Sequence, residues 1–333
     1  MRRIALVNQR YGLEVNGGSE YYTRLIAERL TDHYQVDVIT TKAIDYTTWE
    51  NHYTADEENI NGVRVLRFPV DSDRAKDFNE YNGAYLAQIG EGRFDEAAEK
   101  VWFEKLFPMP EAYVFLTDEE KELVQGLFHT ENIPCRVMGT GVDIPCEPDE
   151  KAFRSKFGIE GEYLIYVGRI DEGKNCPMMF RYFEEYKKRD PQSGLKLVLM
   201  GKPVCDIPKH KDIISLGFVS EEDKFSGISG AKALILPSRF ESLSISVLEA
   251  MSLYVPVIVN GECEVLKGHC IKSNGGLYYN SYFEFEGIVN YIFSHDAEYA
   301  AMRENARKYI DDNYRWEVIM KNFRELIDSL CEE

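Results

Sequence analysis

Short apolar runs alternate along this chain with longer amphipathic stretches, and this alternation constrains the fold more than any other feature. Runs such as Ile4–Val7 and Tyr163–Val167 have the length of buried strands, and the segments between the runs carry apolar residues at helical spacing. Strands that alternate with helices form parallel sheets covered by helices. The sequence therefore predicts an α/β protein built from doubly wound, Rossmann-like sheets.

Ten strands are predicted, in two series separated by a loop at 139–143 and prolines at 145 and 148. The first series is Ile4–Val7, Val36–Ile39, Val63–Phe68, Ala112–Leu116 and Cys135–Met138. The second is Tyr163–Val167, Leu195–Met200, Ile213–Leu216, Ala233–Leu236 and Val255–Val259, followed from Glu298 by a helical tail that breaks near 311–313.

The chain length of 333 residues also favours two domains. We expect an N-terminal domain over 1–145 and a second domain over 146–312, followed by a helix over 313–333. The stretch 69–111 is polar and has no clear strand, although 95–105 has a helical pattern. The first domain is therefore expected to be abbreviated, unless a segment is missing from the sequence.

The amino-acid composition limits the classes of binding partner and the cellular compartment that we expect for this protein. The formal net charge is −18, which argues against nucleic acid, because nucleic-acid binding needs clustered Lys and Arg. The seven cysteines are odd in number and contain no CxxC pair, so we expect reduced thiols. The N-terminal apolar run is too short for a signal peptide, and no run is long enough to span a membrane. A cytoplasmic protein is the expectation.

The most specific motif contains two carboxylates, Glu241 and Glu249, after the apolar run 233–236. A helix that starts near Ser244 would leave the backbone amides of 242–244 free to hold an anion such as a phosphate. Glu241 would then lie in the loop before the helix and Glu249 inside it, each able to accept hydrogen bonds from sugar hydroxyls. A capping Glu followed by an ordinary helical Glu is the alternative.

A second motif follows the strand at 163–167 and contains Gly168, Arg169 and Lys174. It resembles the phosphate-binding loop of NTPases, but Asn175 stands where that loop needs Ser or Thr to hold Mg²⁺. An Arg fork and a Lys point charge suit a diphosphate. A solvated turn, in which Asp171 and its neighbour Glu172 neutralise the two cations, is the alternative.

The third motif is the turn at Gly17 and Gly18, between the first strand and a helix that opens near Ser19. Glycines let a ligand approach the backbone closely, and the helix start offers free amides. The turn is not GxGxxG, so the dinucleotide fingerprint is absent. The alternative is that the Gly-Gly turn only separates the strand from the helix and binds no ligand.

Together these motifs resemble family 4 glycosyltransferases, which are retaining, nucleotide-sugar-dependent enzymes of the two-domain GT-B fold. Phe240–Met251 is the specific part of the resemblance, and Gly17–Glu20, Gly168–Arg169 and Lys174 support it. The resemblance implies transfer of a sugar from a UDP- or GDP-linked donor to a glycan, lipid-linked or small-molecule acceptor. It also implies that the C-terminal helix, around Tyr314, Trp316 and Ile319, crosses back onto the first domain.

The resemblance further implies a role for each motif residue. Arg169 and Lys174 would neutralise the donor diphosphate, and Glu241 would hold the transferred sugar. Glu249 would bind the ribose hydroxyls. Catalysis is thereby assigned to Glu241, Arg169 and Lys174. The remaining donor-binding assignments are Gly17, Gly18 and Gly168 beside the phosphates, Ser242, Leu243 and Ser244 through their amides, and Gly217, Phe218 and Val219 beside the base.

Metal independence is also expected, because cations and helix amides can meet the charge on the leaving diphosphate. No cofactor is therefore predicted, and Asp71-Ser72-Asp73 is interpreted as a solvated turn. Retention fits a reaction in which the donor phosphate assists the incoming hydroxyl on the same sugar face. A nucleophilic Glu241 is the alternative. A lipid-linked acceptor would place the protein at the inner face of the membrane.

Two departures from the family pattern bear on activity. Family members usually carry a His near the reaction centre in the first domain, and none of the six His here stands in that context. Tyr254 stands where the family commonly has Gly, which we expect to alter packing more than chemistry. A nucleotide-sugar-binding protein without activity, another GT-B enzyme such as an epimerase or a phosphorylase, and an NTPase are the alternative functions.

Overall fold

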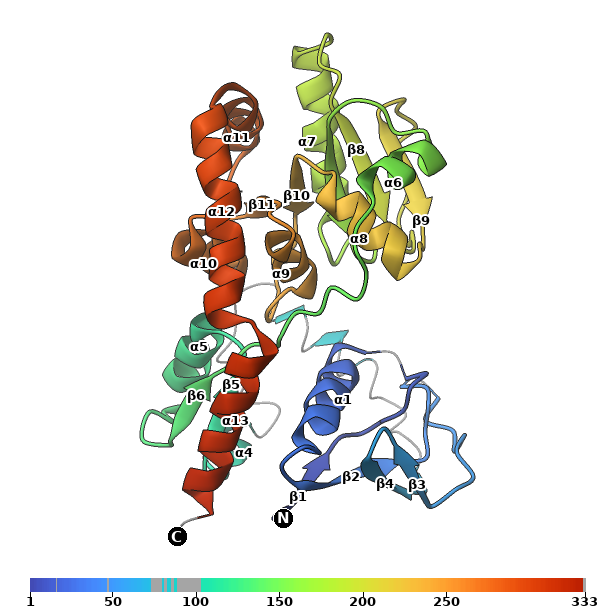
Figure 1. Ribbon diagram of the computed structural model, residues 1–333, viewed down its shortest axis with the longest axis vertical. Coiled ribbons are helices and arrows are strands. Elements are labelled where there is room, and N and C mark those ends of the chain that lie inside the picture. The colour runs from blue at the N-terminus through green and yellow to red at the C-terminus, as the bar shows by residue number, and fades with distance from the viewer. Residues whose placement is uncertain are drawn as a thin grey trace. The chain divides into compact units, whose positions relative to one another are not determined.

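The computed structural model describes residues 1–15, 17–46, 48–72, 80, 83–84, 87–88 and 103–331 (Figure 1). These residues form two compact units. The first unit is Met1–Pro110 together with Phe323–Glu333, and the second is Glu111–Asn322. Within the described residues, no helix has both the length and the apolar character needed to cross a bilayer.

The first unit contains a sheet in the order β1-β2-β4-β3. Strands β1 (Arg3–Val7), β2 (Gln35–Thr41) and β4 (Val63–Phe68) are parallel, and β3 (Glu57–Ile60) joins the edge antiparallel to β4. Helix α1 (Gly18–Leu30) follows β1 and buries Ile26, Ala27 and Leu30. A short helix, α4 (Phe103–Leu106), completes the described elements of this stretch.

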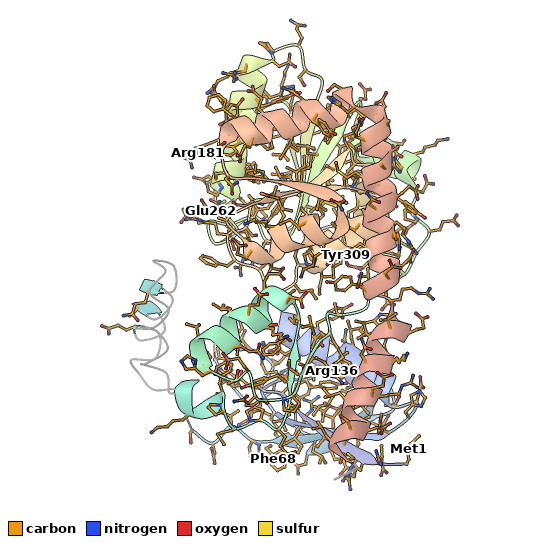
Figure 2. All side chains as sticks on the ribbon, turned by 90° about the vertical axis from the view of Figure 1, so that its left-hand side faces the viewer. Met1, Phe68, Arg136, Arg181, Glu262 and Tyr309 are labelled. Carbon is orange, nitrogen blue, oxygen red and sulfur yellow. The ribbon has the colours of Figure 1, made fainter. Side chains whose placement is uncertain are left out.

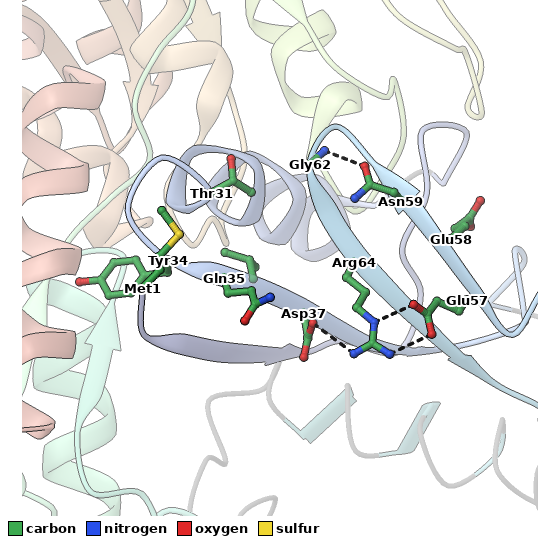
Figure 3. Close-up of a pocket in the computed structure, with 11 residues that line it drawn as sticks. Met1, Thr31, Tyr34, Gln35, Asp37, Glu57, Glu58, Asn59, Gly62 and Arg64 are labelled. Carbon is green, nitrogen blue, oxygen red and sulfur yellow. Dashed lines mark hydrogen bonds and ion pairs between the residues drawn. The ribbon is translucent and has the colours of Figure 1, made fainter.

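A pocket of about 760 Å³ lies at the amino ends of β2 and β4 in the first unit (Figure 3). Its charged lining is already paired: Arg64 donates two hydrogen bonds to Glu57, at 2.7 and 2.9 Å, and Arg3 contacts Asp37 at 2.6 Å. The pocket lies at the end of the sheet opposite to the Gly17–Gly18 turn, which follows the carboxyl end of β1. None of the predicted site residues lines it.

The second unit is organised around a parallel sheet in the order β12-β11-β10-β7-β8-β9. Its strands are β7 (Tyr163–Val167), β8 (Lys196–Met200), β9 (Ile213–Gly217), β10 (Ala233–Leu236), β11 (Val257–Asn260) and β12 (Gly276–Tyr279). The central strands β7 and β10 are buried along nearly their whole length, as expected for a sheet covered on both faces.

Helix α6 (Glu150–Phe157) precedes β7. The helices that follow strands of this sheet are α7 (Cys176–Arg189), α8 (Glu221–Ser229), α9 (Ile245–Ser252), α10 (Glu264–Ser273) and α11 (Tyr282–Ser294). Helix α12 (Asp296–Asn313) packs against α9, α10 and α11, as Figure 1 shows, and α13 (Trp316–Leu330) follows it after a two-residue break. The predicted break in the helical tail is therefore confirmed.

A separate pair of parallel strands, β5 (Tyr113–Phe115) and β6 (Cys135–Val137), lies in the second unit with α5 (Asp118–Phe128) between them in the chain. Thr117 caps α5 by accepting a hydrogen bond from the Glu120 N–H at 3.2 Å. Lys272 of α10 holds α5 through ion pairs to Asp118 and Glu119. The contacts between α5 and α10 explain why the segment from β5 to β6 belongs to the second unit.

The predicted α/β fold and all ten predicted strands are confirmed, with ends that differ by at most two residues. Strands β3 and β12 were not predicted from the sequence. A domain limit is predicted after residue 145, and the two compact units divide between Pro110 and Glu111 and again between Asn322 and Phe323. Most of the strand-poor stretch 69–111 lies outside the described residues, and so does the predicted helix at 95–105 except for 103–105, which belong to α4.

Candidate functional site

The second sheet has a topological switch point between β7 and β10. From β7 the chain adds β8 and β9 on one side, and it then returns to add β10, β11 and β12 on the other. In open parallel sheets, ligands bind outside the carboxyl ends of the strands at such a point. The two loops that leave β7 and β10 there, 168–175 and 237–244, carry two of the motifs singled out from the sequence.

The helices at the centre of this sheet begin without a side-chain cap, whereas those at its edges are capped. Helices α7, α9 and α10, which follow β7, β10 and β11, have no hydrogen bond from a capping side chain. Ser220 caps α8 and Ser281 caps α11, after the edge strands β9 and β12. At the start of α7, the N–H groups of Cys176, Met178 and Met179 already bond to the Asp171 and Asn175 carbonyls, and Pro177 has none. The start of α9, which has no capping side chain, is therefore the place where an anion is favoured.

The two loops at the switch point are joined by an ion pair. Lys174 Nζ lies 2.6 Å from Glu241 Oε1, and the Glu241 side chain is only 12% exposed. The Asn175 side chain donates to the Pro237 carbonyl at 3.1 Å, and so does that of Asn260 from the end of β11. The structure thus brings the second and first sequence motifs together at one edge of the sheet.

Arg169 lies in the same loop and remains largely open to solvent, with 64% of its side chain exposed. It forms an ion pair with Asp171, which also accepts a hydrogen bond from the Lys174 N–H at 2.7 Å. The Tyr166 hydroxyl, from β7, restrains the loop by donating a hydrogen bond to the Arg169 carbonyl at 2.7 Å. Asp171 therefore neutralises Arg169, and the second cation, Lys174, is neutralised by Glu241.

Glu249 lies on α9 and is buried, with 9% of the residue exposed. Its Oε1 is 2.9 Å from Lys224 Nζ on α8, and Lys224 also contacts Glu221 at 3.1 Å. Burial raises the pKa of Glu249 and the Lys224 ammonium opposes that rise. One carboxylate oxygen of Glu249 is thus occupied by a cation from the neighbouring helix.

The other predicted residues of the second unit flank the same edge. Gly217 ends β9 with a left-handed φ of 68°, and Phe218 after it is 92% exposed. In the loop before α9, Ser242 is exposed, Leu243 is buried and Ser244 has a φ of 66°. Gly168, with a φ of 151°, packs against Gly201 at the end of β8.

Gly17 and Gly18 belong to the first unit, where α1 begins at Gly18. A side chain at Gly17 would overlap the Glu20 carboxylate, which pairs with Arg10 at 2.5 Å. This pair is buried, with 7% and 11% of the two side chains exposed. The conformation of the turn is therefore stabilised by the neighbouring Arg10–Glu20 ion pair.

Sequence reasoning missed three residues that shape this site: Asn175, Lys224 and His269. In the sequence, Asn175 stands out only because it departs from the phosphate-binding motif of NTPases. Lys224 lies in a charged helical segment that resembles any exposed helix. His269, which contacts Leu243, was dismissed because it does not match a family position. Within the described ranges, no group of three or more potential metal ligands is found, and Asp73 of the Asp71–Asp73 motif lies outside them.

Residues 149–309 match the family model of the group 1 glycosyl transferases. The matched segment is just under half of the chain and contains both loops at the switch point. It extends from α6 into α12, so it covers the second sheet with its helices.

Curated relatives are distant. An uncharacterized glycosyltransferase of Methanocaldococcus jannaschii is 25% identical over 60% of this chain and 55% of its own length. Mannosylfructose-phosphate synthase of Agrobacterium fabrum is 24% identical over 32% of this chain and 27% of its own length. The chain thus spans about half, or less, of these relatives.

Solved structures resemble the whole chain. Sucrose-phosphate synthase from Thermosynechococcus elongatus has a TM-score of 0.70 at 16% identity, with 100% of both chains covered. Anabaena HepE in complex with UDP-glucose has a TM-score of 0.71 at 13% identity, covering 99% of this chain and 100% of that one. Together with the family match, these likenesses support the predicted GT-B glycosyltransferase fold with Rossmann-like sheets.

Proposed function

We propose that this protein is a glycosyltransferase that takes a sugar from a nucleoside-diphosphate donor, in the manner of family 4. The observation that carries the proposal is the Lys174–Glu241 ion pair, which joins a cation of the loop after β7 to a carboxylate of the loop after β10 at the switch point. The group 1 family match over the same residues supports it. The complex of HepE with UDP-glucose favours a UDP-linked hexose among the donors.

In this proposal each motif residue acts on one part of the donor. The guanidinium of Arg169 and the ammonium of Lys174 bind the diphosphate and stabilise the charge that develops as it leaves. The uncapped start of α9, with the amides of Ser242, Leu243 and Ser244, adds hydrogen-bond donors. Glu241 accepts from hydroxyls of the transferred sugar.

The second oxygen of Glu249 accepts from the ribose, and Phe218 covers the base beside Gly217 and Val219. Gly168 lets the diphosphate approach the backbone.

We further propose retention of configuration without a bound metal. The leaving diphosphate would take the proton of the incoming acceptor hydroxyl on the same face of the sugar. Lys174, Arg169 and helix amides would supply the positive charge that a metal gives elsewhere. The acceptor is a glycan, a lipid-linked glycan or a small molecule, and with a lipid-linked acceptor the protein would act at a membrane surface.

A panel of UDP- and GDP-linked sugars tests the donor assignment. A bound donor should raise the midpoint of thermal unfolding, because a ligand that binds only the folded state stabilises it by mass action. Arg169→Ala and Lys174→Ala should each weaken binding of the nucleoside diphosphate by about 1.5–3 kcal/mol, the scale for hydrogen bonds to charged groups. Unchanged affinity in both variants would contradict the assignment.

Activity is tested by donor turnover with and without EDTA, and by the anomeric configuration of the product. Glu241→Gln should abolish transfer in an active enzyme. Donor binding without turnover, in the presence of a broad acceptor mixture, would favour the alternative of a nucleotide-sugar-binding protein. Mg²⁺-dependent ATP hydrolysis that Lys174→Ala abolishes would favour an NTPase.

A further inference from the structure

A buried histidine contacts the loop that precedes α9. His269 lies on α10 with only 2% of its surface exposed, and its Nε2 is 2.8 Å from the Leu243 carbonyl oxygen. Its Nδ1 is 3.1 Å from the Tyr309 hydroxyl of α12, a residue labelled in Figure 2. The Tyr309 hydroxyl is in turn 3.2 Å from that of Tyr314.

The chemistry of these partners fixes the direction of each hydrogen bond. A carbonyl oxygen can only accept, so the proton of the imidazole is on Nε2. Burial lowers the pKa of His269, which keeps the ring neutral between Lys272 and Glu119, the charged groups that face it. Nδ1 therefore accepts from Tyr309, whose oxygen accepts from Tyr314. Both ring nitrogens are satisfied, and the tautomer is set from both sides.

The hydrogen bond to Leu243 also orients the next amide. A trans peptide group is planar, and its C=O and N–H point in opposite directions. The Leu243 carbonyl points inward to the buried imidazole, so the Ser244 N–H of the same peptide group points away from it. Ser244 is the residue before α9, and its φ of 66° is a conformation that non-glycine residues rarely adopt. The loop thus needs an external restraint, which His269 provides.

We propose that His269 is a positioning residue, which aims the Ser244 N–H at the diphosphate of the nucleotide donor. This inference rests on the proposed function and adds a residue to it. The chain from Tyr314 through Tyr309 to His269 connects the junction between α12 and α13 with the donor loop. The Tyr314 ring packs against Gly139, so the far end of the chain is held in place as well.

Two substitutions separate positioning from packing. His269→Gln places an amide N–H at the level of Nε2 and can still donate to Leu243, whereas His269→Asn ends at the level of Nδ1 and cannot reach it. Affinities are measured by calorimetry for UDP, GDP and ADP, and for the parent nucleoside of the tightest binder by saturation-transfer NMR. The nucleoside lacks the diphosphate and reports on the base and ribose subsites alone.

We expect His269→Asn to weaken binding of the nucleoside diphosphate about tenfold or more, the scale of one hydrogen bond to a charged group. Nucleoside affinity should stay unchanged, and His269→Gln should restore most of the diphosphate affinity. Tyr309→Phe, which removes the donor to Nδ1 without touching the loop, should give a smaller loss in the same direction.

Equal affinities in the Gln and Asn variants, or parallel losses for nucleoside and diphosphate, would overturn the positioning role. If His269→Asn does not fold, the wild type is compared with His269→Gln and Tyr309→Phe instead. The test is then the same ratio, the affinity for the nucleoside diphosphate divided by that for the nucleoside. A wild-type protein that binds none of the three diphosphates would overturn the proposed function, and this inference with it.

Discussion

At the scale of single residues, the pair Lys224–Glu249 decides whether a buried carboxylate is charged. Glu249 loses its hydration on α9, which raises its pKa, and Lys224 at 2.9 Å is the cation that offsets part of this rise. Glu221 faces the same carboxylate and raises its pKa further. An ionised carboxylate is a stronger acceptor for ribose hydroxyls than a protonated one, so in the proposed role the cation from α8 contributes to the site without touching the ligand.

Replacing Lys224 with Met should leave Glu249 buried beside Glu221 without a compensating charge. The pKa of Glu249 should then rise further, so the folded protein binds a proton that the unfolded chain has already lost. Stability of the variant should therefore fall as the pH is raised from 4.5 through the folded-state value. At the alkaline end we expect a loss of about 3 kcal/mol, the lower end for a broken buried ion pair.

Urea unfolding at several pH values measures this difference between variant and wild type. Lys224→Arg keeps the charge and serves as the matched control, with a nearly pH-independent difference. A Lys224→Met variant whose loss of stability is the same at pH 5 and pH 8 would show that Glu249 does not take up the proton. The same variant should bind the nucleoside diphosphate more weakly at low pH, where Glu249 is protonated.

At the scale of elements, the carboxyl ends of β7 and β8 approach so closely that only glycine fits. A side chain on Gly201 would overlap the Gly168 carbonyl, and Gly201 has a φ of 146° in the glycine region. Gly201 also donates to the Gly217 carbonyl at 2.7 Å, which ties the end of β9 to the same place. These glycines hold three strand ends in register beneath the candidate site.

Gly201→Ala should therefore destabilise the second unit by about 3–4 kcal/mol, because both the space and the backbone conformation oppose a side chain. Thermal unfolding measures the change. Gly194→Ala is the control, since a side chain there meets nothing within 4 Å and its φ lies outside the glycine region. Similar midpoints for the two variants would show that the strand ends relax without cost.

The helix starts around the sheet offer a second test at this scale. Ser281 caps α11 at an edge of the sheet, away from the switch point, and its hydroxyl accepts from the Glu284 N–H at 3.3 Å. Ser281→Ala should cost about 1 kcal/mol of stability and leave nucleotide affinity unchanged. Chemical unfolding and calorimetry measure the two effects. A loss of affinity would show that the helix caps at the edges also shape the site.

The elements also show what a sequence can predict. Parallel strands such as β7 and β10 are found from the sequence because both of their faces are buried, which gives continuous apolar runs. Strand β3 has the sequence Glu-Glu-Asn-Ile and forms only because β4 offers it a free edge. Strand β12, with the sequence Gly-Leu-Tyr-Tyr, was missed for another reason: although Tyr favours strands, the run is only four residues long and begins at a glycine.

The residues of the candidate site likewise divide into those that a local sequence motif predicts and those that only tertiary packing brings to the site. Arg169, Lys174 and Glu241 were predicted because they lie in motifs that follow apolar strands, and because these motifs resemble those of family 4 glycosyltransferases. The partners Asp171 and Asn175 stand in the same loops, but their bonds depend on loop geometry. Lys224 and His269 come from helices distant in sequence, and only the packing of α8 and α10 brings them to α9. No local pattern encodes such contacts.

At the scale of the whole molecule, the last residues of the chain belong with its first. Phe323–Glu333 forms part of the first unit, where Asp328 pairs with Arg2 at 2.7 Å and accepts a hydrogen bond from Tyr34 at 3.4 Å. Arg2 and Asp328 are about half exposed, so their ion pair adds little stability in water. The attachment must depend mainly on apolar burial, as at Leu326, which is 7% exposed.

Leu326→Ala should therefore weaken the first unit selectively, by about 2–4 kcal/mol, the range for truncating a buried leucine. Two units can open separately, so amide hydrogen exchange followed by mass spectrometry is the suitable measurement. Exchange should accelerate in β1, β2 and β4, while β7, β8 and β10 keep their wild-type rates. Ile228→Ala, in the core of the second unit, is the converse control. If Leu326→Ala accelerates exchange equally in both units, the chain opens as one cooperative body, and its ends stabilise the whole rather than the first unit.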